Sequence, residues 1–159
     1  MGGDKKKKSG NLTVNRRVSH DYFILEKHEA GIELVGTEVK VIRNGEAGLK
    51  GAWIKVENGE LMLHQVYIPP YAFGNRFNHD SLRTRRLLMH KREIRKLQAA
   101  SEQKGLSLIP LRLYLTHKGR VKVEIGVCRG KAQYDKRETV KRREADLEAK
   151  RSVSKHYRG

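Results

Sequence analysis

The pattern of apolar residues divides this chain at Arg129. Upstream of it, residues 121–127 alternate between apolar and polar side chains, which is the two-residue period of a strand with one buried face. Gly130 ends that pattern, and the sequence after Arg137 contains helix-forming residues but only isolated large apolar ones. A segment that buries so little apolar surface does not offset the entropy that it loses on ordering. The sequence therefore predicts a folded domain followed by a tail that orders only when a charged partner receives it.

The net charge of +17 points to an anionic partner. Residues 1–19 include 6 basic and 1 acidic residues, residues 129–159 include 11 and 5, and the longer middle segment includes 18 and 12. Both ends are therefore more basic per residue than the middle, as expected of arms that follow a phosphate backbone. A generally soluble basic surface is the plain alternative. An anionic membrane surface fits less well, because no amphipathic stretch carries the Trp, Phe or Leu face that interfacial binding needs.

With 159 residues and 37% hydrophobic content, the chain can bury one modest core. We expect a flexible basic N-terminal arm over residues 1–19, a folded domain over residues 20–130, and a basic C-terminal tail over residues 131–159 that is disordered when free. No apolar run approaches the length of a membrane span, and no apolar region follows the lysines at positions 5–8. We therefore expect a cytoplasmic protein that does not bind a membrane.

A long strand is predicted from Tyr22 to Val35. The break at Glu29-Ala30-Gly31 indicates a bulge inside it, which is the device that lets a small sheet curl into a barrel. The next segment, residues 36–45, is ambiguous: Val39 and Ile42 fit a helical face, whereas its β-branched residues favour a strand.

The clearest local signal is a hairpin over residues 52–66, whose Asn58-Gly59 turn supplies the positive φ angles that a type I′ turn demands. A short strand at 87–89, a helix over 91–104 and two strands over 106–116 and 120–128 follow. Seven basic residues and one acidic residue lie between Arg83 and Lys96, which indicates a charged helix face with more than a solubilising role. Together the elements predict a mainly β fold, an antiparallel barrel of the oligonucleotide-binding type with about six strands, two or three helices and a basic C-terminal tail.

Residues 69–80 form a long loop that contains three aromatic residues. Stacking on nucleic-acid bases is one interpretation of these rings. The other, which is more common for loop aromatics, is that they pin the loop to the core.

No group of residues in the sequence indicates catalysis. His20-Asp21 and His79-Asp80 are the two His-Asp pairs, and neither has the converging carboxylates or histidines that a metal cluster or a proton relay needs. No nucleophile-elbow motif surrounds any serine. The single cysteine, Cys128, excludes an internal disulfide and a cysteine-based zinc site, and it lies in opposite phase to the apolar face of its strand. We expect a binding protein rather than an enzyme, without a cofactor or a metal.

A series of short strings follows a fixed order between Asn15 and about Arg143. They are Asn15-Arg16-Arg17 with His20-Asp21-Tyr22, Glu29-Ala30-Gly31, Gly36-Thr37-Glu38-Val39-Lys40, Gly74-Asn75-Arg76-Phe77-Asn78-His79-Asp80, His90-Lys91-Arg92-Glu93-Ile94 and Tyr134-Asp135-Lys136-Arg137. In this combination they resemble the small protein B (SmpB) family, the bacterial proteins that bind transfer-messenger RNA (tmRNA), also called SsrA. Two positions depart from the family pattern, since Ala132 stands where a second lysine is usual and Ser81 where a proline is common.

The resemblance implies an oligonucleotide-binding-type barrel in which residues 37–44 are helical. It also implies a function: binding the tRNA-like domain of tmRNA around its elbow and bringing it to the A site of ribosomes stalled on truncated messages, in place of a codon and anticodon. By position, the RNA-binding surface would contain Asn15, His20, Glu29, Leu88, His90 and Lys122, with Gly130 and Lys131 at the junction with the tail.

The tail takes a separate role in this family. Tyr134 stands where the family stacks a ring on a base of the ribosomal decoding centre, with Asp135, Lys136 and Arg137 beside it, and the rest of the tail would fold as a helix in the empty mRNA channel of the small subunit. Elongation factor Tu and alanyl-tRNA synthetase are implied as indirect partners, and we expect a monomer. From the residues alone, a basic structural ribosomal protein or a general RNA-binding module stays open, as does an RNA-processing enzyme with metal-dependent turnover.

Overall fold

The computed structural model describes residues 10–74 and 78–131 of the chain. In chain order, the elements are β1 (Gly10–Val14), α1 (Val18–Asp21), β2 (Tyr22–Ile32), α2 (Gly36–Arg43), β3 (Trp53–Glu57), β4 (Glu60–His64), β5 (Arg85–Leu88), α3 (Lys91–Glu102), β6 (Leu106–Leu115) and β7 (Val121–Gly130).

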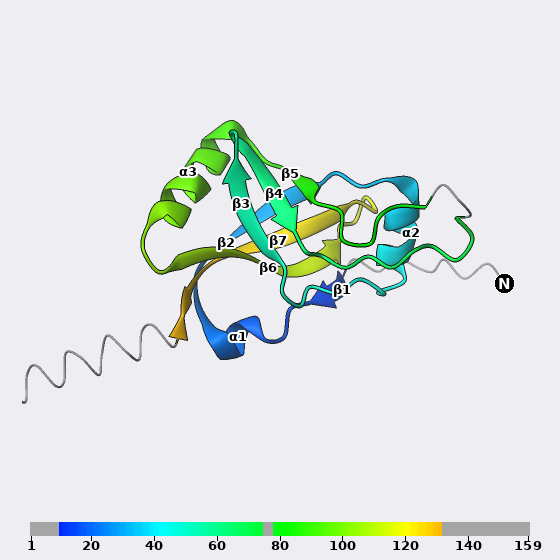
Figure 1. The fold of residues 1–159 in the computed structure, drawn as a ribbon, viewed down its shortest axis with the longest axis horizontal. Coiled ribbons are helices and arrows are strands. Elements are labelled where there is room, and N and C mark those ends of the chain that lie inside the picture. Colours follow the sequence, from blue (N-terminus) through cyan, green and yellow to red (C-terminus); the bar gives the residue numbers. More distant parts are fainter. Residues whose placement is uncertain (1–9, 75–77, 132–159) are drawn as a thin grey trace, which may run out of the picture.

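Six of the strands close into a ring, and β1 is added beside β6 (Figure 1). The order around the ring is β6-β3-β4-β5-β2-β7, and the pairing of β6 with β7 closes it. Every pairing is antiparallel. The predicted mainly β barrel is therefore confirmed, with seven strands and three helices in the described residues where the sequence suggested about six strands.

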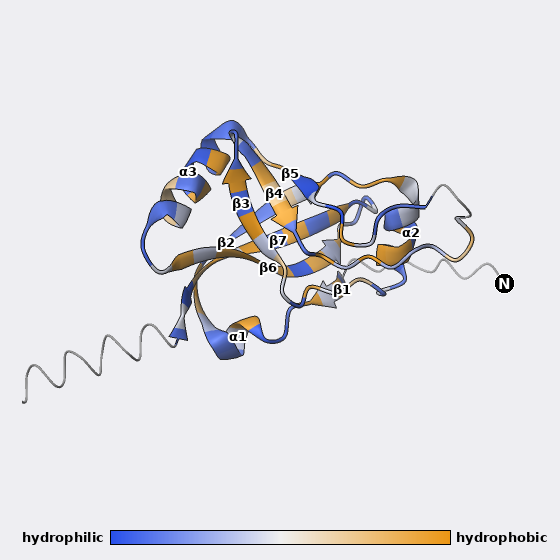
Figure 2. Ribbon diagram, in the orientation of Figure 1, coloured by the Kyte–Doolittle hydropathy of each residue, from blue (hydrophilic) through white to orange (hydrophobic). Residues whose placement is uncertain are grey.

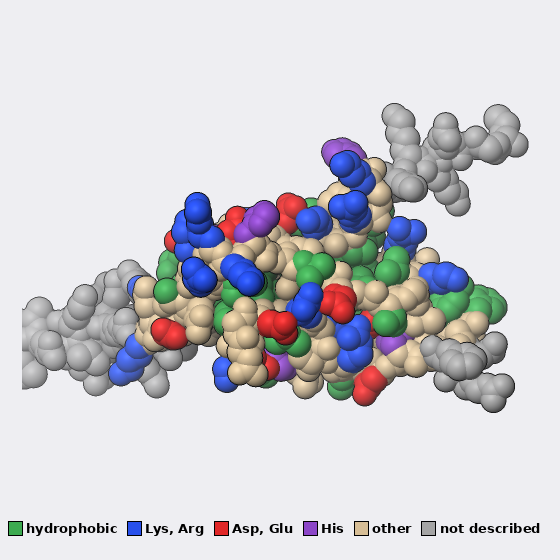
Figure 3. All heavy atoms as spheres, turned by 90° about the horizontal axis from the view of Figure 1, so that it is seen from above, with side chains coloured by type: hydrophobic (Ala, Val, Ile, Leu, Met, Phe, Trp, Pro, Cys, Tyr) green, Lys and Arg blue, Asp and Glu red, His purple; other side chains and the backbone are tan. Residues whose placement is uncertain are grey.

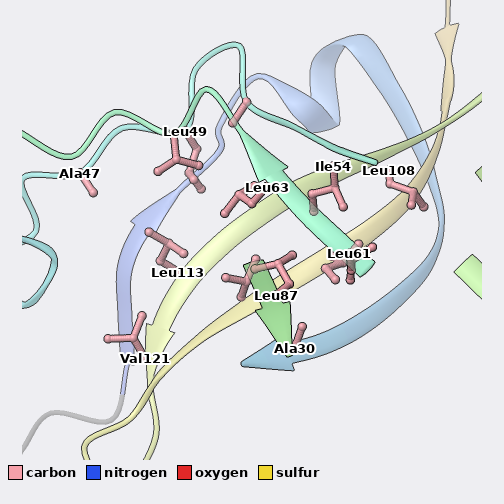
Figure 4. Close-up of a cluster of buried hydrophobic side chains, with 14 of the residues drawn as sticks. Ala30, Ala47, Leu49, Ile54, Leu61, Leu63, Leu87, Leu108, Leu113 and Val121 are labelled. Atoms are coloured by element: carbon pink, nitrogen blue, oxygen red, sulfur yellow. The ribbon is translucent and has the colours of Figure 1, made fainter. Parts of the chain in front are cut away.

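Aliphatic side chains fill the interior of the ring (Figure 4). Leu61 and Leu63 of β4 and Leu113 of β6 belong to this core, and all three are inaccessible to solvent. The apolar members of the alternation at 121–127 are buried, whereas Lys122 and Glu124 between them are partly exposed. Bands of hydrophobic and hydrophilic residues accordingly alternate along the strands (Figure 2). The two-residue period thus gives the barrel one apolar side and one side available for polar contacts.

A bulge in β6 changes which of its side chains face the core. The register of β6 against β7 shifts between Pro110 and Arg112. In a regular strand, Leu108 and Leu113 would face opposite sides of the sheet, because their sequence numbers differ by five. The bulge lets both belong to the barrel core. The residues between them place apolar side chains on the outer face instead.

A second, smaller cluster of buried side chains forms on that outer face, beneath α1. Burial raises the pKa of the Cys128 thiol to about 11, so this cysteine is a neutral packing residue. Its phase agrees with the sequence prediction, and the buried members of the cluster are Val18, Ile109, Leu111 and Cys128.

The ambiguous segment after β2 is the helix α2, as the family resemblance implied. Its Glu38 is fully buried and accepts a hydrogen bond from the backbone N–H of Val35, at 3.0 Å, which satisfies the first turn of the helix. The Glu38 carboxylate also accepts hydrogen bonds from Arg85 Nε and Arg83 Nη2, each at 2.5 Å. The buried Arg85 in turn donates to the carbonyl oxygens of Val66 (2.9 Å) and Arg83 (2.8 Å), so one ion pair ties α2 to β5 and to the connection that precedes it.

The electrostatics of Glu38 follow from these contacts. Burial alone would raise the pKa of its carboxyl group, but hydrogen bonds from Arg83, the Val35 N–H and Arg85 outweigh that effect and leave the pKa below its ordinary value of 4.5. Glu38 is therefore ionised in the folded protein at neutral pH.

Several local predictions are confirmed. The hairpin of β3 and β4 turns at Asn58 and Gly59, which have φ angles of 51° and 76°. The predicted helix after the basic cluster is α3, and it ends shortly before Gly105, whose φ is 85°.

Two predictions were wrong in detail. The N-terminal arm was expected to be loose through Ser19, but its described part forms β1 and the start of α1, with the Thr13 hydroxyl donating to the Ala47 carbonyl at 3.0 Å. The bulge of β2 lies between Ile24 and Glu26, not at Glu29-Ala30-Gly31. Those three residues stay paired with β7, and the missing side chain of Gly31 admits Leu88 of β5 instead, since a Cβ on Gly31 would lie 3.3 Å from Leu88 Cβ.

We predict that Gly126→Ala destabilises the barrel, because the added Cβ would lie 2.8 Å from Leu111 Cδ2 and 2.9 Å from Cys128 Sγ. The expected loss in the free energy of unfolding, measured with urea, is about 1–3 kcal/mol. Gly48→Ala is the control, because no atom lies within 4 Å of a Cβ placed there. Equal losses in the two variants would contradict the packing of the second cluster against Gly126.

We predict that Glu38→Gln costs about 3–5 kcal/mol at neutral pH, because it leaves the buried charge of Arg85 without its partner. The pKa of Glu38 is lowered in the folded state, so its contribution to stability is fully present above pH 4.5 and is lost as the pH falls through the folded-state pKa. The difference between wild type and variant should therefore shrink in acid. Glu33→Gln removes an exposed carboxylate 3.2 Å from Arg86 and should cost less than about 1 kcal/mol at any pH. A pH-independent difference for Glu38→Gln would contradict the assignment.

Candidate RNA-binding surface

The outward side chains of β2, β7 and β6 form a connected polar group, here called the outer network, made of Glu29, Arg112, Tyr114, Lys122 and Glu124. Arg112 donates through Nε and Nη2 to Glu124 Oε2, at 3.1 and 3.0 Å, and its guanidinium carbon lies 4.2 Å from the Tyr114 ring centroid. Lys122 Nζ is 3.9 Å from Glu29 Oε1. The strand register sets this arrangement, since Glu29 pairs with Glu124 and Lys122 pairs with Tyr114.

Tyr114 is held as a neutral phenol within the outer network. Burial raises the pKa of its hydroxyl, and a hydrogen bond to Glu29 together with the negative charge of that carboxylate raises it further. Glu29 remains exposed beside it, and Lys122 is partly exposed. The network therefore offers a fixed carboxylate acceptor and a cation to a partner on this face of the barrel.

Leu88 lies at the edge of the same face. It is 46% exposed and packs on Gly31, the residue that pairs with both Leu88 and Lys122. A shallow groove of about 390 Å³ begins here, and Arg43, Leu88, Arg120 and Lys122 are among its lining residues. Glu29, Leu88 and Lys122, for which the family resemblance implied a role in RNA binding, are thus brought together.

Four more of the proposed residues gather at the α1 end of β2 and β7. Gly130 pairs with Tyr22, and Lys131 donates to the backbone carbonyl of Ser19 at 2.8 Å, with its Nζ 5.2 Å from the Phe23 ring centroid. The side chain of His20 is 88% exposed and contacts Asp21 at 2.8 Å. Asn15 donates to the Pro110 carbonyl at 3.1 Å and fixes the connection between β1 and α1 to β6.

The two groups lie along one pair of strands. The seven residue steps from Tyr22 to Glu29 correspond to about 23 Å of β2. His90, the remaining proposed residue, is exposed at the N-cap of α3 and follows Leu88 by two residues, so it lies within about 7 Å of Leu88 along the backbone. The proposed residues therefore form an elongated surface rather than one compact site.

The predicted basic face of α3 is exposed beside His90. Its cations are not neutralised within the described part of the chain, where no acidic group lies within 4.0 Å of them. Lys and Arg side chains gather over the α3 end of the molecule in the view of Figure 3. This face suits a phosphate backbone, and its exposed members are Lys91, Arg92, Arg95 and Lys96.

The two His-Asp pairs of the sequence make different contacts. His79 uses both ring nitrogens for structural contacts, to the Thr37 hydroxyl at 2.8 Å and the Ile68 carbonyl at 2.9 Å. Asp80 instead accepts from the Leu82 N–H at 3.0 Å. Over residues 10–74 and 78–131, no cluster of three or more His, Cys, Asp or Glu side chains could hold a metal ion.

The aromatic loop before β5 has two kinds of ring. Tyr71 packs against the core, its backbone is tied by the Asn78 side chain at 3.0 and 2.7 Å, and Lys40 Nζ lies 5.1 Å from its ring centroid. Phe73 is 81% exposed. Phe77 lies outside the described residues, as do Tyr134, Asp135, Lys136 and Arg137 of the proposed decoding-centre contact.

Sequence reasoning missed Arg112, Tyr114 and Glu124 as parts of the surface. The signal was present in the alternation of β6 and β7, whose polar positions carry opposite charges. The bulge between Pro110 and Arg112 hid it, because the pairing of Arg112 with Glu124 depends on a register that no local pattern gives.

Comparison with known proteins identifies the family. A model of the SmpB protein family matches residues 12–155. The chain belongs to this family. The SsrA-binding protein of Geobacillus kaustophilus is 54% identical over 141 residues, which cover 89% of this chain and 90% of that protein. The SsrA-binding protein of Staphylococcus carnosus is 50% identical over 157 residues, covering 99% and 100%.

A solved structure described as "tmRNA-SmpB: a journey to the center of the bacterial ribosome" contains a chain with the same fold. The two chains align with a TM-score of 0.65 and 50% sequence identity, over 74% of this chain and 82% of the other. As for membrane association, none of the helices among the described residues has the length and apolar character to cross a bilayer.

Proposed function

We propose that this protein binds tmRNA and acts in trans-translation, the rescue of stalled ribosomes. The observation that carries the proposal is the identity of 50–54% to SsrA-binding proteins over 89–99% of the chain. The likeness to a chain of a tmRNA–SmpB structure supports it. The charge of the chain agrees with an RNA partner, since its net value is +17.

The surface around the outer network is suited to a folded RNA rather than to a regular duplex. Glu29 can accept hydrogen bonds from base edges or 2′-hydroxyls, Lys122 can pair with a phosphate, and the exposed Leu88 can contact the face of an unstacked base. A tRNA-like elbow presents all three features close together. We therefore assign the tRNA-like domain of tmRNA to this surface, with His90 and the basic face of α3 beside it, and with Asn15, His20, Gly130 and Lys131 toward the tail.

The C-terminal tail is proposed to recognise the state of the ribosome. In this proposal Tyr134 stacks on a base of the decoding centre in the A site, Asp135, Lys136 and Arg137 lie beside it, and the following residues fold as a helix in a vacant mRNA channel. Stacking tolerates any base, which suits a protein that must recognise a stalled ribosome and not a particular message. A segment that folds on binding reports directly whether the channel is free.

The protein acts by binding, as a monomer in the cytoplasm, and requires no cofactor. Elongation factor Tu and alanyl-tRNA synthetase are indirect partners, because they act on the bound RNA. In this proposal the barrel binds tmRNA, and the tail recognises a ribosome with a vacant mRNA channel.

The test is a competition between a tRNA-like fragment of tmRNA and duplex RNA of equal charge, from about 50 to 200 mM salt. Binding driven by phosphates alone falls by roughly 10³ or more over this range. A preference for the tRNA-like fragment that survives high salt is the expected result. Lys122→Gln should weaken that preference about tenfold, whereas Lys55→Gln, on β3 across the ring, should not change it. Equal affinities that collapse together would instead indicate a basic RNA clamp or a structural ribosomal protein.

We predict that Tyr134→Ala leaves binding of the tRNA-like fragment within about twofold and slows rescue of stalled ribosomes about 5- to 150-fold, the loss of a stacking contact of about 1–3 kcal/mol. Rescue is measured as tmRNA-dependent peptide tagging on a truncated message. Tyr134→Phe, which keeps the ring, should retain most of the activity. Equal loss of RNA binding and rescue in Tyr134→Ala would contradict the division between barrel and tail.

A further inference from the structure

Two carboxylates of the outer network face each other across adjacent strands. Glu29 of β2 pairs directly with Glu124 of β7. Like charges in such a pair repel each other, and the repulsion favours conformers that turn the more exposed side chain toward solvent. Glu29 is the more exposed of the two, with 57% of its side chain accessible against 20% for Glu124. A fixed orientation of the Glu29 carboxylate therefore depends on further contacts.

Arg112 of β6 neutralises Glu124 and leaves Glu29 to other partners. Its Nε and Nη2 both donate to Glu124 Oε2, at 3.1 and 3.0 Å. Its Nη1 donates to Asn11 Oδ1 of β1 at 2.6 Å. Because the guanidinium is a rigid planar fork, these three hydrogen bonds fix its plane as well as its position. Arg112 is thus anchored between β1 and β7.

Two side chains contact Glu29 within the described part of the chain. Lys122 Nζ lies 3.9 Å from Glu29 Oε1, which is too long for a good hydrogen bond. The Tyr114 hydroxyl of β6 donates a hydrogen bond to the Glu29 carboxylate. Since β7 lies between β6 and β2, this contact spans two strand spacings, or about 10 Å. A tyrosine is long enough to cross that distance, and it places a donor at the end of its ring.

The ring of Tyr114 is itself held in place. The guanidinium carbon of Arg112 lies 4.2 Å from the ring centroid, close enough for a cation–π contact. The residue is half-buried in the sheet surface. Arg112 covers one face of the ring, and Glu29 takes the hydroxyl proton. Tyr114 is therefore arranged to hold a neighbouring group and not to stack on a base.

We propose that Tyr114 is a positioning residue for RNA binding. Its hydroxyl holds the Glu29 carboxylate so that the remaining lone pairs of that group meet a hydrogen-bond donor of the tRNA-like domain. Arg112 supports this role by fixing the Tyr114 ring. The inference rests on the proposed function, because it takes Glu29 as a contact to the RNA.

The expected benefit is preorganisation. A free glutamate side chain loses rotamer freedom when it is immobilised in an interface, and this loss weakens binding by about 2- to 10-fold. Glu29 avoids most of that loss, since folding has already ordered it. The competing interpretation, in which Tyr114 stacks on a base, predicts that a phenylalanine at this position binds RNA equally well.

The first test is therefore Tyr114→Phe in the full-length protein, which keeps the ring and removes the hydroxyl. Its affinity for the tRNA-like fragment should fall about 2- to 10-fold. Its affinity for duplex RNA of equal charge should stay unchanged. Tyr67→Phe is the matched control, because it removes a hydroxyl from an exposed tyrosine outside the outer network. Unchanged affinity of Tyr114→Phe for the tRNA-like fragment, or an equal loss in Tyr67→Phe, overturns the proposal.

Two further measurements separate positioning from a general structural effect. Tyr114→Phe should keep the slope of log affinity against log salt, since it removes no phosphate contact, whereas Lys122→Gln should reduce that slope by about 1. In a Glu29→Ala background, Tyr114→Phe should have no further effect, because nothing is left for its hydroxyl to position. Additive losses in the double variant, or a changed salt slope in Tyr114→Phe, overturn the proposal.

Urea unfolding of each variant confirms that it is folded. Should Tyr114→Phe fail to fold, Arg112→Lys decides, because it keeps the charge, Tyr114 and Glu29 but loses the planar fork that fixes the ring. Its affinity for the tRNA-like fragment should fall about 2- to 10-fold, and an unchanged affinity overturns the proposal. Failure of the proposed function has a different signature, the absence of any preference for the tRNA-like fragment in the wild-type protein.

Discussion

The ion pair between Glu38 and Arg85 is the contact on which the arrangement of the barrel wall depends. Two charges inaccessible to solvent are costly unless every remaining donor and acceptor is satisfied. Here Glu38 also accepts from Arg83 and from the Val35 N–H at the start of α2. Arg85 donates to the carbonyl oxygens of Val66, which follows β4, and of Arg83, which precedes β5. The pair therefore fixes the position of α2 relative to β5. It fixes the positions of Leu88 on β5 and of Arg43 on α2. Arg43 donates to the Gly119 carbonyl at 2.9 Å, and both residues line the groove that also contains Lys122.

Ring closure explains how one small domain can combine a filled core with an outer surface that is accessible on every strand. A closed sheet has an interior filled by aliphatic residues and an exterior that is available all around, so polar groups on β2, β6 and β7 do not compete with aromatic groups on β3 and β4. The outer network consists of cross-strand pairs of opposite charge, whereas Trp53 of β3 and His64 of β4 form a stacked pair of rings.

Much of the fold could be predicted because its signals are local. The Asn58-Gly59 turn, the alternation of β7 and the period of α3 each depend on residues close in sequence. The features that were missed depend on distant partners: β1 and α1 have few apolar residues of their own and are held by β6 and by the second cluster. The bulge of β2 was misplaced because Gly31 resembles a bulge residue, while its actual role is to admit Leu88. For the site, family resemblance supplied Glu29, Leu88 and Lys122. The partners in β6 required the register of the strands.

The position of β7 has a mechanical consequence. β7 is the last strand before the tail, and it is hydrogen-bonded on both sides over its length, to β2 from Tyr22 to Gly31 and to β6 from Leu106 to Leu115. A force applied to the chain beyond Lys131 along the strand axis loads both ladders in shear, so many hydrogen bonds must fail together. Peeling, in which bonds break one after another, would need a force across the sheet. A force that pulls on the tail along the strand axis can thus be transmitted to the barrel without unfolding it.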